Sequence, residues 1–363
     1  MEFDEQVVRG DKIKDLLPEF VCVRMVQAND LDLNLFQFDY DMSFALFFMN
    51  ADNTIYGRYG TRNGNAERSD DHISLEGLRE AMTGALALHK NVARYKPRLA
   101  AKSAPSPDGK QNPLEFPELK KKFGPSVNYQ NKDVAKTCLH CHQINGERRK
   151  TTRLARQPIS DKLLFQWPMP DTVGLSMNPQ KRATVQQVKP QSPAATAGVR
   201  PGDTILAIQS QPIISTADIQ WVLHNAGETD TLQLLVRRGG QTRPLNLTLS
   251  PGWRRNADIS WRVSTWDMRR MALGGMKLEA EPNNRSGKMA LKAIHVGQYN
   301  EHAIAKRAGV KKGDVLLEFN GLSNEMSEQE LITHTMQNTK PGDVVAVKLK
   351  RGGRVIDTKI KLP

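Results

Sequence analysis

Two cysteines and a histidine stand close together near the middle of this 363-residue chain, at Cys138, Cys141 and His142. Two thiols separated by two residues can add to the two vinyl groups of one haem, and the adjoining imidazole can then ligate the iron. The spacing therefore favours a c-type haem, with Cys138 and Cys141 as covalent anchors and His142 as the metal-binding proximal ligand. Two alternatives stay open: a thiol or disulfide pair, and a structural zinc site that recruits a further ligand.

A methionine downstream could complete such a haem site. Met169 lies in the extended run Trp167-Pro168-Met169-Pro170, and methionine opposite histidine is a known axial pairing in haem proteins. Simple packing of this side chain is the alternative. We expect residues 118–171 to form a small haem or metal module, because so short a segment has too little core to hold itself without a bound group.

The charge of the chain changes sign near residue 88, which predicts a domain edge there. Residues 1–87 carry 8 basic and 16 acidic groups, whereas residues 88–160 carry 16 and 5, within a chain of net charge +13. The basic stretch surrounds the Cys-x-x-Cys-His motif, and its lysine and arginine runs are either solvated faces or a docking surface for an acidic redox partner. Nucleic-acid binding is not expected, since no aromatic side chains are interleaved with the basic ones.

The sequence shows neither a membrane span nor an export signal. No window approaches eighteen apolar residues, so no integral membrane segment is expected. Residues 1–5 are acidic and lack the basic and apolar regions of a signal peptide. Because haem is attached outside the cytoplasm, we predict a periplasmic location and an export signal encoded upstream of Met1.

Residues 1–92 predict a partial α/β domain. Residues 19–26 have the β-branched enrichment of a strand, with Cys22 as a small buried hydrophobe within it. Residues 42–49 and 54–59 flank a turn and predict a hairpin, and Ser74 precedes apolar residues at helical spacing. This order resembles the back half of a thioredoxin fold. The visible part lacks the thioredoxin Cys-x-x-Cys, so the resemblance implies a redox pair upstream; residues 93–117 then form a proline-rich linker.

An internal repeat fills the last two hundred residues. Residues 192–206 recur as residues 302–317, each with a short helix, a glycine cap, a Gly-Asp turn and an apolar strand. Each copy is followed by a predicted helix, at 217–225 and 327–338, and by a strand pair broken at Arg-Gly-Gly. The repeats resemble PDZ domains of the kind found behind HtrA-like serine proteases, which are partly open β-barrels with two helices each.

We place the first PDZ domain at residues 172–252 and the second at 270–363, with a tryptophan-rich segment at 253–269 between them. The resemblance implies that each domain adds an extended peptide to a sheet edge beside a helix, while amides of a Gly-rich loop hold the peptide carboxylate. The expected partners are protein C-termini or unfolded peptides. The expected binding residues are Val173, Gly174, Leu175, Ser176, Ile219 and Val222 in the first domain, and Gly274, Gly275, Met276, Leu331 and Ile332 in the second.

The whole order of parts resembles a bacterial family of thioredoxin/PDZ-domain proteins, some of whose members carry selenocysteine. The predicted fold is a multidomain chain of α/β and β parts: a partial thioredoxin-like domain, an irregular Cys-x-x-Cys-His module and two tandem PDZ domains. Our leading hypothesis is a periplasmic redox protein whose haem transfers electrons while the PDZ modules bind peptides. The alternative is a non-catalytic peptide-binding adaptor or chaperone-like scaffold with zinc or a disulfide at the motif. No catalytic residue is assigned, since the chain offers no setting for a Ser-His-Asp nucleophile.

Overall fold

The computed structural model describes residues 11–61, 72–282 and 284–363. The acidic residues 1–5 lie outside this description. The described residues have a mixed α/β structure with several separate antiparallel sheets. The chain divides into two compact units, each built from two segments. The first unit comprises residues 1–141 and 165–257, and the second comprises residues 142–164 and 258–363.

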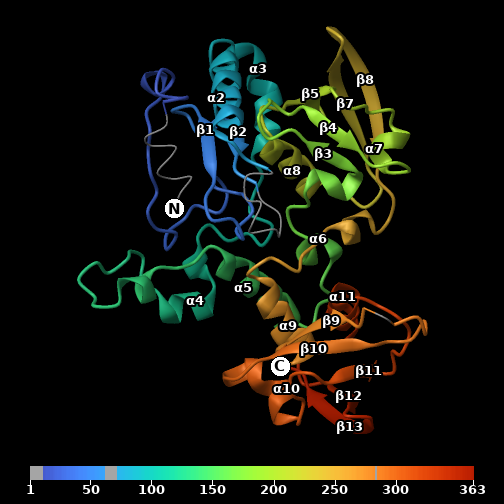
Figure 1. The fold of residues 1–363 in the computed structure, drawn as a ribbon. Helices are drawn as coiled ribbons and strands as arrows, with labels where there is room; N and C mark the ends of the chain where they lie inside the picture. The colour runs from blue at the N-terminus through green and yellow to red at the C-terminus, as the bar shows by residue number, and fades with distance from the viewer. Residues whose placement is uncertain (1–10, 62–71, 283) are drawn as a thin grey trace. The chain divides into compact units, whose positions relative to one another are not determined.

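The first unit begins with a hairpin and a long helix. Strands β1 (Leu46–Met49) and β2 (Ile55–Tyr59) pair antiparallel around a turn in which Asn53 takes a φ of 65°. Helix α2 (Leu75–His89) starts at Ser74, whose side chain accepts a hydrogen bond from the Gly77 amide as an N-cap. The helix packs against both strands with its apolar face (Figure 1). The predicted hairpin and helix are therefore confirmed.

The strand predicted at residues 19–26 does not form. Residues 21–26 have no regular secondary structure, and Val21 and Val23 are 94% and 82% exposed. Cys22 is exposed as well, so the prediction that it is buried is wrong. Without a third strand in the described residues before position 92, the hairpin stays a two-stranded sheet. These residues thus give no support to a thioredoxin-like sheet.

The segment that follows is a series of short helices in the first unit. Pro97 lies inside α3 rather than in a linker, and the Pro-rich stretch after it keeps only short helical turns. The elements outside the hairpin are η1 (Leu17–Glu19), α3 (Val92–Leu99), η3 (Ala100–Lys102), η4 (Pro113–Glu115), α4 (Pro117–Lys122) and η5 (Val134–Thr137).

The first predicted PDZ domain occupies the rest of the first unit. Its four-stranded sheet has the order β6-β5-β7-β8, and β3 pairs separately with β4. The strand pair β7–β8 turns at Arg238-Gly239-Gly240, as the sequence predicted. The strands are β3 (Leu175–Met177), β4 (Val185–Val188), β5 (Thr204–Ile208), β6 (Gln211–Pro212), β7 (Thr231–Arg238) and β8 (Gln241–Thr248). The helices are η6 (Pro170–Val173), α7 (Pro193–Thr196), α8 (Thr216–Asn225) and η7 (Trp253–Asn256).

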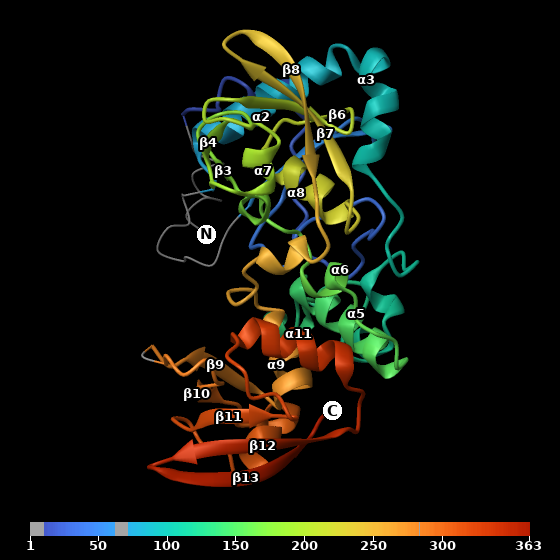
Figure 2. The same ribbon diagram turned by 90° about the vertical axis from the view of Figure 1, so that its right-hand side faces the viewer.

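The second unit contains the second predicted PDZ domain. Its sheet has the order β13-β12-β11-β10-β9, which leaves β9 at one edge. Helices α9 and α11 pack against each other and against β9 (Figure 2). The strands are β9 (Met276–Ala280), β10 (Leu291–Val296), β11 (Val315–Phe319), β12 (Val344–Arg351) and β13 (Arg354–Lys361). The helices are α5 (His142–Leu154), α6 (Asp161–Leu164), α9 (Thr265–Leu273), η8 (Asn300–Ala303), α10 (Ile304–Arg307) and α11 (Glu328–Asn338).

Buried arginines join α5 to the rest of the second unit. Arg149 is fully buried and donates to the Ser264 hydroxyl at 2.9 Å. Arg153, 3% exposed, donates to the Thr339 carbonyl and hydroxyl at 3.0 and 3.1 Å. The basic run at residues 148–150 looks like a solvated face in the sequence. These hydrogen bonds explain why the helix that contains it instead packs in the second unit, with partners more than a hundred positions away in the sequence.

Candidate functional site

The start of helix α8 is fixed by a serine cap in the first unit. The Ser215 side chain accepts a hydrogen bond from the Ala217 amide at 3.0 Å, and its hydroxyl donates to the carbonyl of Arg58. Serine at this position satisfies one of the amides that a helix leaves unpaired at its first turn. The same residue therefore starts the helix and joins it to strand β2.

Asp218 on the first turn of α8 also joins the helix to the N-terminal elements of the first unit. Its carboxylate lies 2.8 Å from the Lys102 ammonium, and both side chains are fully buried. It also accepts hydrogen bonds from the amides of Arg58 and Ile214 at 3.1 and 3.0 Å. Burial lowers the pKa of Lys102, and the Asp218 charge opposes that shift. One face of α8 thus packs against the N-terminal elements of the first unit.

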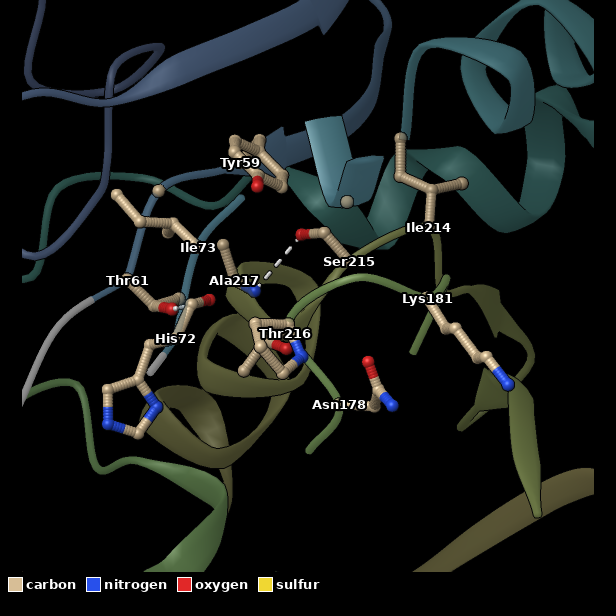
Figure 3. A pocket seen from close by; sticks show the side chains of 13 residues that line it. Tyr59, Thr61, His72, Ile73, Asn178, Lys181, Ile214, Ser215, Thr216 and Ala217 are labelled. Carbon is tan, nitrogen blue, oxygen red and sulfur yellow. Dashed lines mark hydrogen bonds between the residues drawn. The ribbon is translucent and has the colours of Figure 1, made fainter. Parts of the chain in front are cut away.

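A pocket opens where strand β3 ends and helix α8 begins. The space around it, open solvent included, is about 290 Å³, but the centre of a water-sized sphere can reach only about 10 Å³ of this space. Asn178, just after β3, and Thr216, at the start of α8, both line it (Figure 3). The hydroxyl of Tyr59 donates to the Ser74 carbonyl at 2.6 Å and keeps one wall in place. The complete lining is Tyr59, Gly60, Thr61, His72, Ile73, Gly77, Asn178, Pro179, Lys181, Ile214, Ser215, Thr216 and Ala217.

The other end of α8 is covered by Trp167. Its ring stacks on His224 with centroids 4.6 Å apart, and its amide donates to the His224 ring nitrogen at 3.3 Å. The Gln220 side-chain amide donates to the Trp167 carbonyl at 3.2 Å. Trp167 has a φ of 51°, which non-glycine residues rarely adopt. Sequence reasoning missed this residue, although the Trp-Pro-Met-Pro run marked it as part of an extended segment.

The predicted binding loop of the first domain lies beside this helix. Gly174 has a φ of +89°, and a Cβ there would stand 2.1 Å from the Ser192 hydroxyl, so only glycine fits. Val173 and Leu175 are 1% and 2% exposed, while Ser176 is exposed. Of the loop residues only Ser176 is exposed, because Gly174 is buried with its amide bonded to the Asp171 carbonyl, and the apolar side chains belong to the core.

The predicted helix residues of the first domain lie in the same core. Ile219 and Val222 are 1% and 4% exposed and share a hydrophobic cluster with Val173 and Leu175. The fold thus brings the four apolar positions of the predicted site into one hydrophobic cluster.

The second domain holds its predicted residues in a similar arrangement. Gly274 and Gly275 have φ values of 62° and 91°, and a Cβ on Gly275 would lie 1.9 Å from the His302 carbonyl oxygen. Met276, Leu331 and Ile332 are all buried. Sequence reasoning missed helix α9, which ends at this glycine pair.

The Cys-x-x-Cys-His motif does not form a module of its own. Cys138 and Cys141 belong to the first unit, and His142 is the first residue of α5 in the second. Both thiols are free and partly buried. Burial, and next the neighbouring Cys138, raise the pKa of the Cys141 thiol to about 11, so at neutral pH it stays protonated and is a poor metal ligand. Met169 is 8% exposed, and its carbonyl accepts the Thr172 amide in the turn η6.

The residues that could bind metals do not gather in the described structure. Within residues 11–61, 72–282 and 284–363, no three His, Cys, Asp or Glu side chains come together as a metal site. In the same part of the chain, no helix combines the length and the apolar character that crossing a membrane requires.

Comparison with protein families identifies the repeats. The model described as "PDZ domain" matches residues 171–249 and 281–362. The chain therefore contains two PDZ domains, as the sequence predicted. The first match includes the loop at 173–176, whereas the second begins after β9.

Several curated proteins resemble part of the chain. A probable periplasmic serine endoprotease DegP-like of Pseudomonas savastanoi is 27% identical over 186 residues, which cover 50% of this chain and 37% of that protein. A probable periplasmic serine protease do/HhoA-like of Haemophilus influenzae is 27% identical over 177 residues, 49% and 34% of the two chains. The periplasmic serine endoprotease DegP of Escherichia coli is 27% identical over 182 residues, 50% and 35%. The chain spans about a third of the length of these relatives.

Two solved structures resemble smaller parts. The HtrA3 PDZ domain bound to a phage-derived ligand is 25% identical, with a TM-score of 0.17, and the match covers 21% of this chain and 63% of that one. An HtrA-type protease with a decapeptide is 13% identical, with a TM-score of 0.22, covering 36% and 40%.

The comparisons correct the leading hypothesis. The relatives are named serine endoproteases, so the prediction of a haem redox protein with a thioredoxin-like part is wrong. The cofactor prediction, haem or zinc at Cys138, Cys141 and His142, is wrong as well, because no metal site forms among the described residues. The acidic redox partner has no support. The predicted periplasmic location is confirmed by relatives that are themselves periplasmic.

Proposed function

We propose that this protein is a peptide-binding adaptor of the periplasm, and that its first PDZ domain takes the apolar C-terminus of another protein or an extended segment of an unfolded chain. The observation that carries this proposal is the pocket at the junction of β3 and α8, where the domain that matches the PDZ family supplies Asn178 and Thr216 and the N-terminal elements supply Tyr59 and Gly77. A PDZ domain binds its ligand between such a strand and such a helix.

The geometry supports a ligand that enters past the first turn of α8. A peptide added to the outer edge of β3 passes beside Asn178 and Thr216, which both line the pocket (Figure 3). Its carboxylate then points toward the loop at Val173 and Gly174, since the peptide runs antiparallel to the strand. The proposal thus includes Val173 and Gly174 as members of the loop that holds the peptide carboxylate.

The expected affinity is modest. Burial of one Leu-sized peptide side chain contributes about 1.5–3 kcal/mol, and each hydrogen bond to the carboxylate contributes about 1.5–3 kcal/mol. Ordering of the peptide and loss of its overall motion offset several kcal/mol of this gain. A dissociation constant in the micromolar range or weaker follows.

The test blocks the pocket without disturbing the core. Leu175 is unsuitable, because at 2% exposure a charged substitution would unfold the domain. Thr216→Trp instead fills the pocket from a half-buried position, and we expect it to weaken binding of a decapeptide ending in valine at least about tenfold. Thr242→Trp, on the exposed edge strand β8, is the matched control and should bind normally. If both variants bind the peptide as the unchanged protein does, the pocket is not the entrance.

A further inference from the structure

The two PDZ domains differ at one corresponding place, where the edge strand meets the start of the second helix. In the first domain Ser215 caps α8 and Thr216 is the first helical residue, beside the pocket. In the second domain Ser327 caps α11 and Glu328 is the first helical residue. Thr216 and Glu328 therefore occupy equivalent positions, but one has a short side chain and the other a long, charged one.

Glu328 binds a backbone amide with which a bound peptide would form a hydrogen bond. Its Oε1 accepts a hydrogen bond from the amide of Leu278 at 2.7 Å. Leu278 lies in β9, the edge strand that pairs with β10 on its other side. A peptide added to this edge must offer its own carbonyl to such amides. In this structure the Glu328 carboxylate already accepts the hydrogen bond that a peptide carbonyl would accept from the Leu278 amide.

Helix α9 holds Glu328 there. The Arg269 guanidinium donates to Oε1 at 3.0 Å and to Oε2 at 2.7 Å, a two-point contact that fixes the carboxylate in direction as well as in place. The Arg269 side chain is 1% exposed and that of Glu328 is 11% exposed. Arg269 also stacks on the Trp266 ring at 4.8 Å, which braces it from its own helix.

The same helix uses the amides of the predicted carboxylate loop. The amides of Gly274 and Gly275 donate to the carbonyl of Arg269. Helix α9 packs against both α11 and β9, so it lies along the two elements between which a peptide would bind. Its backbone and its arginine thus engage the loop and the strand edge together.

We propose that helix α9 is a built-in closing element of the second PDZ domain, locked by the Arg269–Glu328 ion pair, so that this domain admits a peptide only when the pair opens. The inference rests on the proposed function, since it concerns which of the two domains is ready to bind. The first PDZ domain then binds a peptide without such an opening, and the second binds one only after the ion pair has opened.

The test follows both domains in the full chain at once. Amide signals of Ser176 and Leu278 report on β3 and β9 while a decapeptide ending in valine is added. In the unchanged protein, Ser176 should respond at a peptide concentration at least about tenfold below that needed for Leu278, because a groove that is mostly closed binds more weakly by its open fraction. Response of both amides at the same concentration would overturn the proposal.

Two variants separate closure from loss of fold. Glu328→Gln keeps an acceptor for the Leu278 amide but removes the charge that Arg269 binds, and Leu278 should then respond at a peptide concentration about tenfold lower than before. If the amides of β12 and β13 lose their protection from hydrogen exchange in this variant, the double variant Arg269→Met with Glu328→Thr is measured instead. It leaves no unpaired buried charge and places at position 328 the threonine that the first domain has at the equivalent position 216. A folded variant whose Leu278 response is unchanged overturns the proposal. Absence of a Ser176 response in every protein, with a gain at Leu278, would instead defeat the proposed function of the first domain.

Discussion

Two aspartates show why the Gly-Asp turn recurs in both PDZ domains. Asp203 and Asp314 follow the repeated glycine, and each receives two hydrogen bonds from an arginine at the end of a later strand, Arg238 or Arg351, at 2.6 to 2.7 Å. Each arginine also donates to a carbonyl just before the turn. Burial alone would raise the pKa of Asp203, but the hydrogen bonds from Arg238 and the Arg200 amide outweigh it and hold this pKa below its ordinary value.

The first prediction concerns the pH dependence of this pair. A lowered pKa in the folded state contributes stability that is present above the unfolded pKa of about 3.9 and is lost as pH falls through the folded value. Asp203→Asn should therefore cost about 1.5–3 kcal/mol at pH 7, and the difference from the unchanged protein should shrink below about pH 4. Urea unfolding between pH 3 and pH 7 measures both values.

The control for that experiment is an aspartate outside any such pair. Asp357 is exposed on β13, so Asp357→Asn should leave the unfolding free energy nearly unchanged at every pH. A stability difference for Asp203→Asn that stays constant from pH 7 to pH 3 would contradict an ionic contribution from this carboxylate.

Among the elements, helix α8 depends on an ion pair that no local pattern reveals. Lys102 and Asp218 are fully buried and lie 116 positions apart in the sequence. Removal of one partner of a buried pair leaves an uncompensated charge in the interior, which costs far more than the pair itself contributes. The pair therefore ties the PDZ helix to the N-terminal part of its unit.

Lys102→Met tests this dependence. We expect it to lower the unfolding free energy by about 3–5 kcal/mol, and addition of Asp218→Asn to restore part of the loss, because the buried charge is then gone. Lys96→Met is the matched control, since Lys96 pairs with Asp52 at the surface and its loss should have little effect. Calorimetry on the unchanged protein, Lys102→Met, Asp218→Asn and the double variant gives the coupling directly, and additive losses in the double variant would exclude it.

The sequence predicted elements whose signals are local. The hairpin followed from its turn, α2 from the cap at Ser74, and both PDZ domains from the repeated glycines, caps and Arg-Gly-Gly turns. Helix α5 was missed because its arginine run looks like a solvated face, and α9 because residues 253–269 were interpreted as a tryptophan-rich connecting segment, whereas Arg149 and Arg269 are buried against partners distant in sequence. The Cys-x-x-Cys-His spacing was misleading, since three residues of suitable type do not fix where a fold places them.

For the whole molecule, the division of the chain differs from its charge pattern. The change of sign near residue 88 suggested an edge there, but residues 1–141 and 165–257 form one unit. Residues 142–164, with α5 and α6, belong to the second unit together with residues 258–363. Each unit is thus discontinuous in sequence, because contacts such as those of Arg149 and Arg153 outweigh proximity along the chain.

The last prediction tests this discontinuous division by hydrogen exchange. Segments that unfold together exchange together, so weakening of the second PDZ domain should also expose α5. Asp314→Asn removes the charge that binds Arg351, and we expect amides of α5 and β12 to exchange about 10- to 100-fold faster while those of α2 stay unchanged. Asp203→Asn, the equivalent change in the first domain, should accelerate α2 and β7 and spare α5. Acceleration of α5 by Asp203→Asn rather than by Asp314→Asn would show that this helix unfolds with the first unit, and the assignment of residues 142–164 would then be wrong.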